Sequence, residues 1–188
     1  MVEILPYQTR WPAEFTSIAS TLRRGLGDLA LRIDHIGSTS VPGLAAKDVI
    51  DIQITVAALD DRVKSAMQTL GYSRLEGFCR DHRPARAEGP ESEWDKWLFD
   101  PPPGQRHTNT HVRVQGRANQ RYALLFRDYL GAHPATAEAY AELKRRLAQH
   151  LADQRTYPEV KDPAVDLIYL AAEEWAAAVR WQPGPPDA

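Results

Sequence analysis

The sequence predicts a mixed α/β (α+β) fold, in which a sheet covered by helices is followed by a C-terminal helical half. Residues 30–36 and 49–56 alternate apolar and polar side chains, and this period of two is typical of strands. From residue 119 onward, apolar residues recur at helical spacing instead. We therefore expect one domain over residues 1–181, with its sheet half in about 1–115 and its helical half in about 119–181.

The composition is that of an ordinary globular protein. Of 188 residues, 43% are hydrophobic and 26% are charged, and the formal net charge is −2. This balance gives no global field that would attract nucleic acid or an anionic membrane. The single cysteine, Cys79, excludes an internal disulfide and a Cys-rich zinc site. With no signal-peptide pattern and no run of roughly 18 apolar residues, we expect a cytoplasmic protein without a nucleic-acid or membrane partner.

The first elements follow from local patterns. Residues 11–26 carry apolar side chains at helical spacing, and Gly25 and Gly27 favour a helix end there. The strand over 30–36 leads into Gly-Ser-Thr-Ser-Val-Pro-Gly, residues 37–43, which is typical of a loop.

The segment 49–56 gives the clearest strand signal. Its apolar face carries Ile50, Ile52, Ile54 and Val56. Its polar face carries Asp51, Gln53 and Thr55. Residues 59–70 then predict an amphipathic helix, with Asp60 as its cap and Gly71 as its stop.

The middle of the chain is less regular. Short strands are expected at 72–75 and 94–99, and the charged, Pro- and Gly-containing segment 80–93 predicts a mobile loop. Residues 106–114 alternate again. One face of this strand carries His107, Asn109, His111 and Arg113.

Three helices are predicted in the C-terminal half, over residues 119–130, 134–151 and 163–181. Pro134 and Pro163 are expected in first turns, where a helix tolerates proline. The Pro/Gly-rich end, 182–188, is expected to be disordered.

The densest motif is HIGSTSVPGLAAK, residues 35–47, followed by a strand with Ile-Asp-Ile at 50–52. It resembles the GrpB family (UPF0157-type), within the nucleotidyltransferase-fold superfamily. The similarity continues in LFRDYL at 125–130, AHP at 132–134, AYAELK at 139–144 and the spacing of Tyr157 and Lys161. It covers about residues 5–181 and implies a nucleotidyltransferase-like mixed sheet.

The resemblance implies an enzyme that transfers a nucleotidyl group from a nucleoside triphosphate to a small-molecule hydroxyl. A Gly-Ser loop would hold the triphosphate, and glycine admits a ligand closely while hydroxyls and N–H groups bind phosphate oxygens. Asp51 stands where the family fold places a magnesium ligand, and Mg²⁺ prefers such hard oxygens. The loop residues are Gly37, Ser38 and Thr39, and the expected phosphate-binding cations are Lys47, Arg113, Arg127, Lys144 and Lys161.

Two departures from the superfamily pattern leave the activity open. Gln53 occupies the position of a second acid, and residues 106–114 offer no third one. Asp51, Gln53 and His111 are the catalytic candidates, with the imidazole as an acid/base or as a phosphate contact. The alternative is a catalytically degenerate module that binds a nucleotide or phosphorylated metabolite, with a coenzyme A-related role. Chemistry on the histidine face is a third possibility.

Several candidates have plain structural interpretations. Lys47 suits either a solvated surface or a phosphate, whereas His35 is expected to pack and bond the backbone. Asp48 is expected to cap a turn, and Arg127 to pair with Asp128.

Overall fold

The computed structural model describes residues 2–85 and 87–188. Its centre is a five-stranded sheet in the order β1-β2-β5-β4-β3. The strands are β1 Arg32–Ile36, β2 Ile50–Val56, β3 Ser73–Arg74, β4 Trp97–Asp100 and β5 Thr108–Val114. Strands β2 and β5 run parallel, and the other neighbouring pairs are antiparallel. The predicted mixed sheet is thus confirmed.

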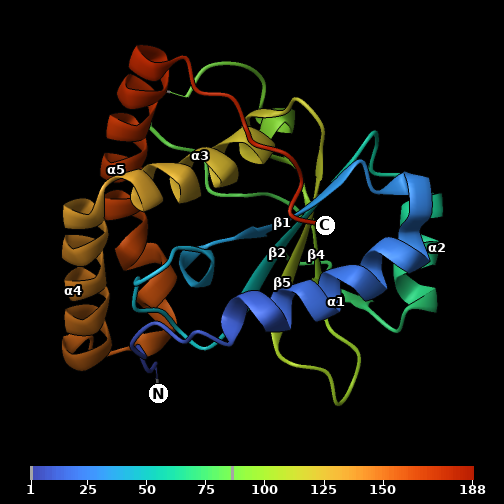
Figure 1. Ribbon diagram of the computed structural model, residues 1–188, viewed down its shortest axis with the longest axis horizontal. Helices are drawn as coiled ribbons and strands as arrows, with labels where there is room; N and C mark the ends of the chain where they lie inside the picture. Colours follow the sequence, from blue (N-terminus) through green and yellow to red (C-terminus); the bar gives the residue numbers. More distant parts are fainter. Residues whose placement is uncertain (1, 86) are drawn as a thin grey trace.

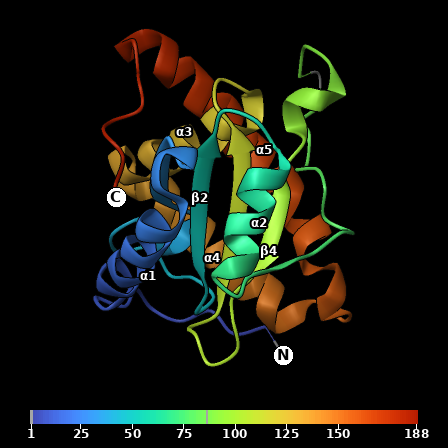
Figure 2. The same cartoon turned by 90° about the vertical axis from the view of Figure 1, so that its right-hand side faces the viewer.

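Helices lie on both sides of the sheet. In Figure 1 the sheet separates α1 and α2 from α3, α4 and α5, and in Figure 2 α1 and α2 lie in front of it. The α-helices are α1 Trp11–Leu26, α2 Asp61–Thr69, α3 Ala118–Ala132, α4 Pro134–His150 and α5 Tyr157–Val179. Within the described part of the chain, none of the helices combines the length and apolar character needed to cross a membrane.

The apolar face of β2 forms the main core. Ile50, Ile52 and Ile54 are fully buried there, in one cluster with Phe15 of α1 and Met67 of α2. Truncation of such an isoleucine to alanine costs about 2–5 kcal/mol, so this core fixes which face of β2 points away from it. The polar face therefore looks toward α3 and α5 and becomes available for a site.

Local signals placed most helix ends correctly. Asp60 caps α2, because its carboxylate accepts hydrogen bonds from the N–H groups of Arg62 and Val63 at 3.0 and 3.2 Å. Gly71 follows the helix with a φ of +84°, which favours glycine.

Pro163 is not in a first turn, as the sequence suggested. Helix α5 begins six residues earlier, at Tyr157, so Pro163 lies inside it. Pro158 takes the first-turn position instead, where the missing N–H costs no helical hydrogen bond.

The C-terminal segment, expected to be disordered, lies along the edge strand β1. Ala188 N–H donates to the carbonyl of Ile33 at 3.1 Å, and His35 N–H donates to the Asp187 carboxylate at 2.9 Å. Strand β1 has a free edge in the sheet order, and an extended segment can satisfy its backbone groups there.

Candidate functional site

Gly37 brings the turn after β1 directly against Asp51. The β1–β2 register pairs Ile36 with Asp51, and Gly37 follows with a φ of +71°. A Cβ atom on Gly37 would lie 2.3 Å from Asp51 Oδ2, far inside contact distance. Only glycine therefore fits both the backbone conformation and the space, and the Gly-Ser turn and the acidic side chain share one site.

A cavity of about 230 Å³ opens beside this pair. Ser38 and Asp51 line it, together with Lys47, Lys144 and Lys161, and we call it the lysine cavity. Its walls also include Thr39, Asn109, Tyr140 and Tyr157. Residues far apart in the sequence, from the turn, the sheet, α4 and α5, thus meet around one space.

Two of the three lysines contact neutral groups. Lys144, which is buried, donates to Ser38 Oγ at 2.9 Å and to the carbonyl of Ala45. Lys47 Nζ lies 3.9 Å from the centre of the Tyr157 ring, a cation–π contact. Among residues 2–85 and 87–188, no carboxylate lies within ion-pair distance of these lysines.

Burial and mutual repulsion disfavour the charged amines. Burial, with the positive charge of Lys161, lowers the pKa of Lys144 to about 7. The pKa values of Lys47 and Lys161 are also lowered, mainly by burial, while Asp51 acts in the opposite direction. Burial raises the pKa of Asp51, although the Asn109 hydrogen bond and Lys161 oppose this. An anion in the cavity would stabilise all three cations.

The polar faces of β2 and β5 lie side by side. Their register pairs Asp51 with Asn109 and Gln53 with His111. Asn109 Nδ2 donates to Asp51 Oδ1 at 2.7 Å. His107 lies outside β5 and is exposed, so it does not share this face.

Both polar atoms of the Gln53 side chain are bonded within the protein. Its amide donates to the carbonyl of Gln120 at 3.1 Å, and its carbonyl oxygen accepts from Arg113 at 2.6 Å. The side chain is fully buried. Gln53 therefore links Arg113 of β5 to α3.

Asp81 was missed by the sequence reasoning. It comes from the segment 80–93, which was expected to be only a mobile loop, and of which Arg86 lies outside the described residues. Its carboxylate accepts from Arg113 Nε at 2.8 Å and from Lys96 Nζ at 2.7 Å. Although burial opposes ionisation, Arg113 and Lys96 hold the pKa of Asp81 well below its usual range. No periodic pattern in the loop marks this residue.

The partners of Asp51 and Asp81 show whether these carboxylates are available for the expected magnesium ion. Asp51 has one carboxylate oxygen bonded to Asn109, and Asp81 is neutralised by two cations. The part of the chain that the structure describes has no group of three or more His, Cys, Asp or Glu side chains placed to hold a metal. Since Mg²⁺ needs several oxygen ligands, these residues do not fit a protein-built magnesium site.

Thr39 lines the lysine cavity, but its hydroxyl group is bonded to His35. Thr39 Oγ1 lies 3.0 Å from Nε2 of His35, whose pKa is lowered to about 4 by burial and by Arg127. His35 also stacks on Phe15 at 4.7 Å, so the expected packing is confirmed, whereas its ring bonds the Thr39 hydroxyl where a backbone partner was expected.

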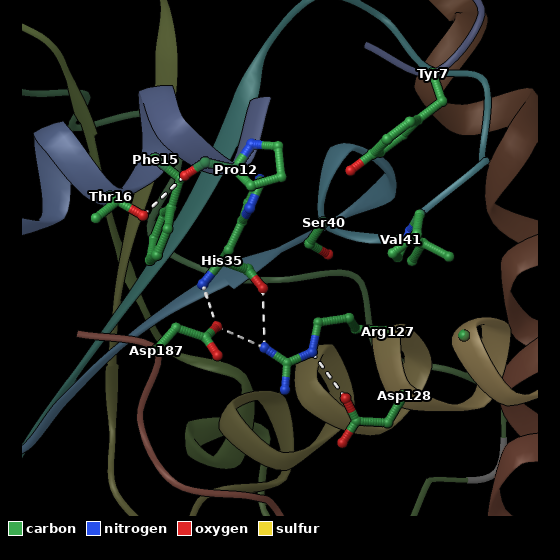
Figure 3. Close-up of a pocket in the computed structure, with 12 residues that line it drawn as sticks. Tyr7, Pro12, Phe15, Thr16, His35, Ser40, Val41, Arg127, Asp128 and Asp187 are labelled. Atoms are coloured by element: carbon green, nitrogen blue, oxygen red, sulfur yellow. Dashed lines mark hydrogen bonds and ion pairs between the residues drawn. The ribbon is translucent and has the colours of Figure 1, made fainter. Parts of the chain in front are cut away.

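Arg127 lines a different cavity of about 540 Å³, on the side of the turn shown in Figure 3. It donates to Asp128 and Asp187, both at 2.8 Å, and to the carbonyl of His35 at 3.0 Å. The expected ion pair with Asp128 is confirmed. The structure does not bring Arg127 into the lysine cavity.

The Asp48 side chain is bonded to α1 and to an arginine that precedes β5. Its carboxylate accepts from Trp11 Nε1 at 2.7 Å and forms ion pairs with Arg10 and Arg106. These bonds tie α1 to the start of β2 and leave Asp48 out of the lysine cavity.

Comparison with known proteins gives one consistent family. Residues 1–170 match the family described as GrpB protein. A UPF0157 protein of Halalkalibacterium halodurans is 35% identical over 91% of this chain and 82% of its own length. The crystal structure of conserved protein GrpB from Enterococcus faecalis has a TM-score of 0.73 at 28% identity, covering 92% of this chain and 99% of that one.

Other similarities are partial. The dephospho-CoA kinase of Mycolicibacterium paratuberculosis is 37% identical over 97% of this chain but only 48% of its own length. The chain thus spans about half the length of such curated relatives. The Cid1 poly(U) polymerase, solved with MgGTP, has a TM-score of 0.50 at 13% identity, covering 77% of this chain and 44% of that one. This likeness shows a nucleotidyltransferase-like fold and no more.

Proposed function

This chain belongs to the GrpB family, and we propose that it binds a phosphorylated small molecule in the lysine cavity, with a nucleoside triphosphate as the first candidate. The observation that carries the proposal is the convergence of Lys47, Lys144 and Lys161 on one cavity beside Ser38. Phosphate groups would provide the negative counter-charge that is missing next to these amines.

Holding the three like-charged lysines close together costs free energy. Lys161 lowers the pKa of both Lys47 and Lys144, so the cations repel one another. Such an arrangement lowers the stability of the folded protein unless a bound anion compensates for the repulsion. Groups with shifted pKa values of this kind cluster at functional sites. Because a phosphate oxygen accepts strong hydrogen bonds from ammonium groups, it is the ligand chemistry that suits this cavity.

The names of the relatives suggest which molecules to test. A nucleoside triphosphate follows from the nucleotidyltransferase-like fold. Dephospho-coenzyme A follows from the kinases in which a similar region makes up about half of the protein. Both carry phosphates joined to an uncharged organic part, so a common site could bind either.

Nucleotidyl transfer is the second candidate. The contact between the Gly37 turn and Asp51 supports it, because a carboxylate then lies beside the turn that would bind phosphate. The buried Gln53, bonded to Arg113 where a second acid would be needed, argues against a magnesium-dependent mechanism. Metal-independent binding is therefore the primary proposal, and transfer would require the ligand to bring its own magnesium.

Thermal unfolding with added ligand tests the binding. Inorganic triphosphate, each nucleoside triphosphate and dephospho-coenzyme A should raise the midpoint, since a ligand of the folded state stabilises it by mass action. Lys144→Met should abolish the shift. Arg146→Met removes a positive charge two residues along α4, from a side chain that is 72% exposed, and should retain it. A chain unaffected by every phosphate compound would overturn the proposal.

A pyrophosphate-release assay separates the two candidates. Purified protein, magnesium, the nucleotide that binds and a pool of small hydroxyl compounds are incubated together. Release that depends on the pool supports transfer, whereas binding without release in any pool supports a binding module.

A further inference from the structure

A second cavity, of about 220 Å³, shares Asp51 and Lys161 with the lysine cavity. Three aromatic side chains line it, namely Trp94, Tyr122 and Phe126, and we call it the aromatic cavity. The shared residues place the two cavities next to each other, so one ligand could extend from one into the other.

Tyr122 packs against both of the other aromatic rings of this cavity. The rings of Tyr122 and Phe126 are parallel within 2°, with centres 6.4 Å apart. Trp94 meets Tyr122 edge-on, at 5.7 Å and 75°. Such walls favour a flat, uncharged group over a phosphate, because aromatic rings offer large apolar area with little flexibility to lose.

His111 also lines the aromatic cavity, and its hydrogen bonds define its tautomer. Its Nδ1 lies 3.4 Å from Lys96 Nζ and 3.4 Å from a terminal nitrogen of Arg113. Both neighbours are donors without an acceptor site, so Nδ1 must be the acceptor and the ring proton belongs on Nε2. Burial and these two cations also lower the pKa of His111 well below its ordinary value, which keeps the ring neutral.

The Nε2 edge is the part of His111 left for a ligand. Among residues 2–85 and 87–188, Nε2 has no hydrogen-bond partner, and the opposite side of the ring is turned to the cations. Trp94 and Asn119, which line the same cavity, each keep a fully buried polar atom without a partner in the described chain, Trp94 Nε1 and Asn119 Oδ1. Unpaired buried groups are rare in folded proteins and call for an explanation.

We propose that the aromatic cavity binds the uncharged, planar part of the phosphorylated ligand, and that His111 selects it by donating a hydrogen bond from Nε2–H to a carbonyl or ring-nitrogen acceptor. This inference rests on the proposed function, since it assigns the second part of the same ligand. It also replaces the expected role of His111 as a protonated phosphate contact, because a neutral imidazole beside two cations has no charge to offer.

Calorimetric titration can separate the two parts of the ligand. Inorganic triphosphate probes the lysine cavity alone, whereas the four nucleoside triphosphates and dephospho-coenzyme A probe both cavities. At least one organic ligand should bind about tenfold or more tightly than inorganic triphosphate. His111→Phe should remove about tenfold of that affinity, the value of one hydrogen bond, and leave inorganic triphosphate within about twofold. His107→Phe, which changes an exposed neighbouring histidine, is the matched control and should leave both unchanged.

Nitrogen NMR on the unmodified protein gives a second readout in case His111→Phe fails to fold. The His111 ring should show a protonated Nε2 and a bare Nδ1 at neutral pH. The Nε2–H signal should move when the organic ligand is added and stay in place with inorganic triphosphate.

The outcomes distinguish the two proposals. Equal affinity for inorganic triphosphate and all organic phosphates would overturn the aromatic subsite and leave the lysine cavity intact. An equal loss of both affinities in His111→Phe would also overturn it, because His111 would then act on the phosphates. If no phosphate compound binds, the lysine cavity and the aromatic subsite both fail.

Discussion

Lys144 Nζ donates a hydrogen bond to Ser38 Oγ across 2.9 Å, and this contact joins α4 to the turn that follows β1. The two residues are separated by more than a hundred positions in the sequence. The contact ties the helical half to the turn that faces Asp51, so the lysine cavity exists only when both halves of the chain are folded.

The free energy of unfolding should depend on pH through Lys144. Burial lowers its pKa from 10.5 to about 7, so unfolding takes up a proton between these values. Stability should therefore rise with pH between about 7 and 10.5, by at most about 1.4 kcal/mol per pH unit. Lys144→Met should flatten this slope in chemical unfolding, and Arg146→Met should not. An identical slope in Lys144→Met would contradict the assignment.

Ligand affinity should change with pH in the opposite sense. An anion favours the charged amine, so binding of inorganic triphosphate should weaken as the pH rises above about 7. Titration of Lys144→Met at the same pH values should show a smaller change. Binding that strengthens with pH would exclude Lys144 as a phosphate contact.

Gly37→Ala should disrupt the site, and Gly43→Ala should not. Both glycines have a positive φ, +71° and +81°, so both substitutions strain the backbone, and at Gly37 the ψ of −171° adds to the strain because that region is essentially restricted to glycine. A Cβ on Gly37 meets Asp51 Oδ2, whereas one on Gly43 meets nothing within 4 Å. Gly37→Ala should therefore unfold at a lower temperature and bind triphosphate more weakly than Gly43→Ala. Equal effects would mean that the close approach to Asp51 is unimportant.

Asp51→Asn tests the metal. Without magnesium, removal of a negative charge beside the lysines should leave triphosphate affinity equal or higher, by up to about tenfold. Asparagine keeps an oxygen for the Asn109 hydrogen bond, which limits the structural change. Calorimetry with and without magnesium measures both effects. A loss of affinity seen only with magnesium would instead identify Asp51 as a metal ligand.

Asp81→Asn should destabilise the fold strongly. It leaves the charges of Lys96 and Arg113 buried without a counter-ion, and breaking a buried pair in this way costs about 3–5 kcal/mol. Asp95→Asn breaks a more exposed pair with Arg80 and should cost less than about 1 kcal/mol. Urea unfolding of both variants gives the comparison. Since Arg113 and Lys96 lower the pKa of Asp81, its stabilising effect is present at neutral pH and is lost only in strong acid.

Arg127→Met should leave phosphate binding unchanged. Arg127 lies in the cavity of Figure 3, bonded to Asp128 and Asp187, and not in the lysine cavity. The variant should lose about 1–3 kcal/mol of stability, because a half-buried charge network is broken. A clear drop in triphosphate affinity at unchanged stability would show that Arg127 reaches the ligand.

Pro163 and Asp81 mark the limits of sequence-based prediction. Proline signals a first turn, but two prolines, Pro158 and Pro163, lie close together, and it is the first of them that lies in the first turn of α5. The segment that carries Asp81 has no period and no apolar face, so nothing local indicates that one of its carboxylates is nearly enclosed by Arg113 and Lys96. Such residues are positioned by their partners, which come from distant parts of the chain.

The sequence by itself determined the sheet with its two-faced strand β2, the Gly37 turn and the family resemblance, because period, turn chemistry and motif are local properties. The tertiary structure alone decided that Gln53 and Arg113 bond to each other, that Arg127 lies apart, and that the two cavities meet at Asp51 and Lys161. The reason is physical: whether a charged side chain is available to a ligand depends on which opposite charges lie next to it. Chain folding sets those neighbours over long sequence separations.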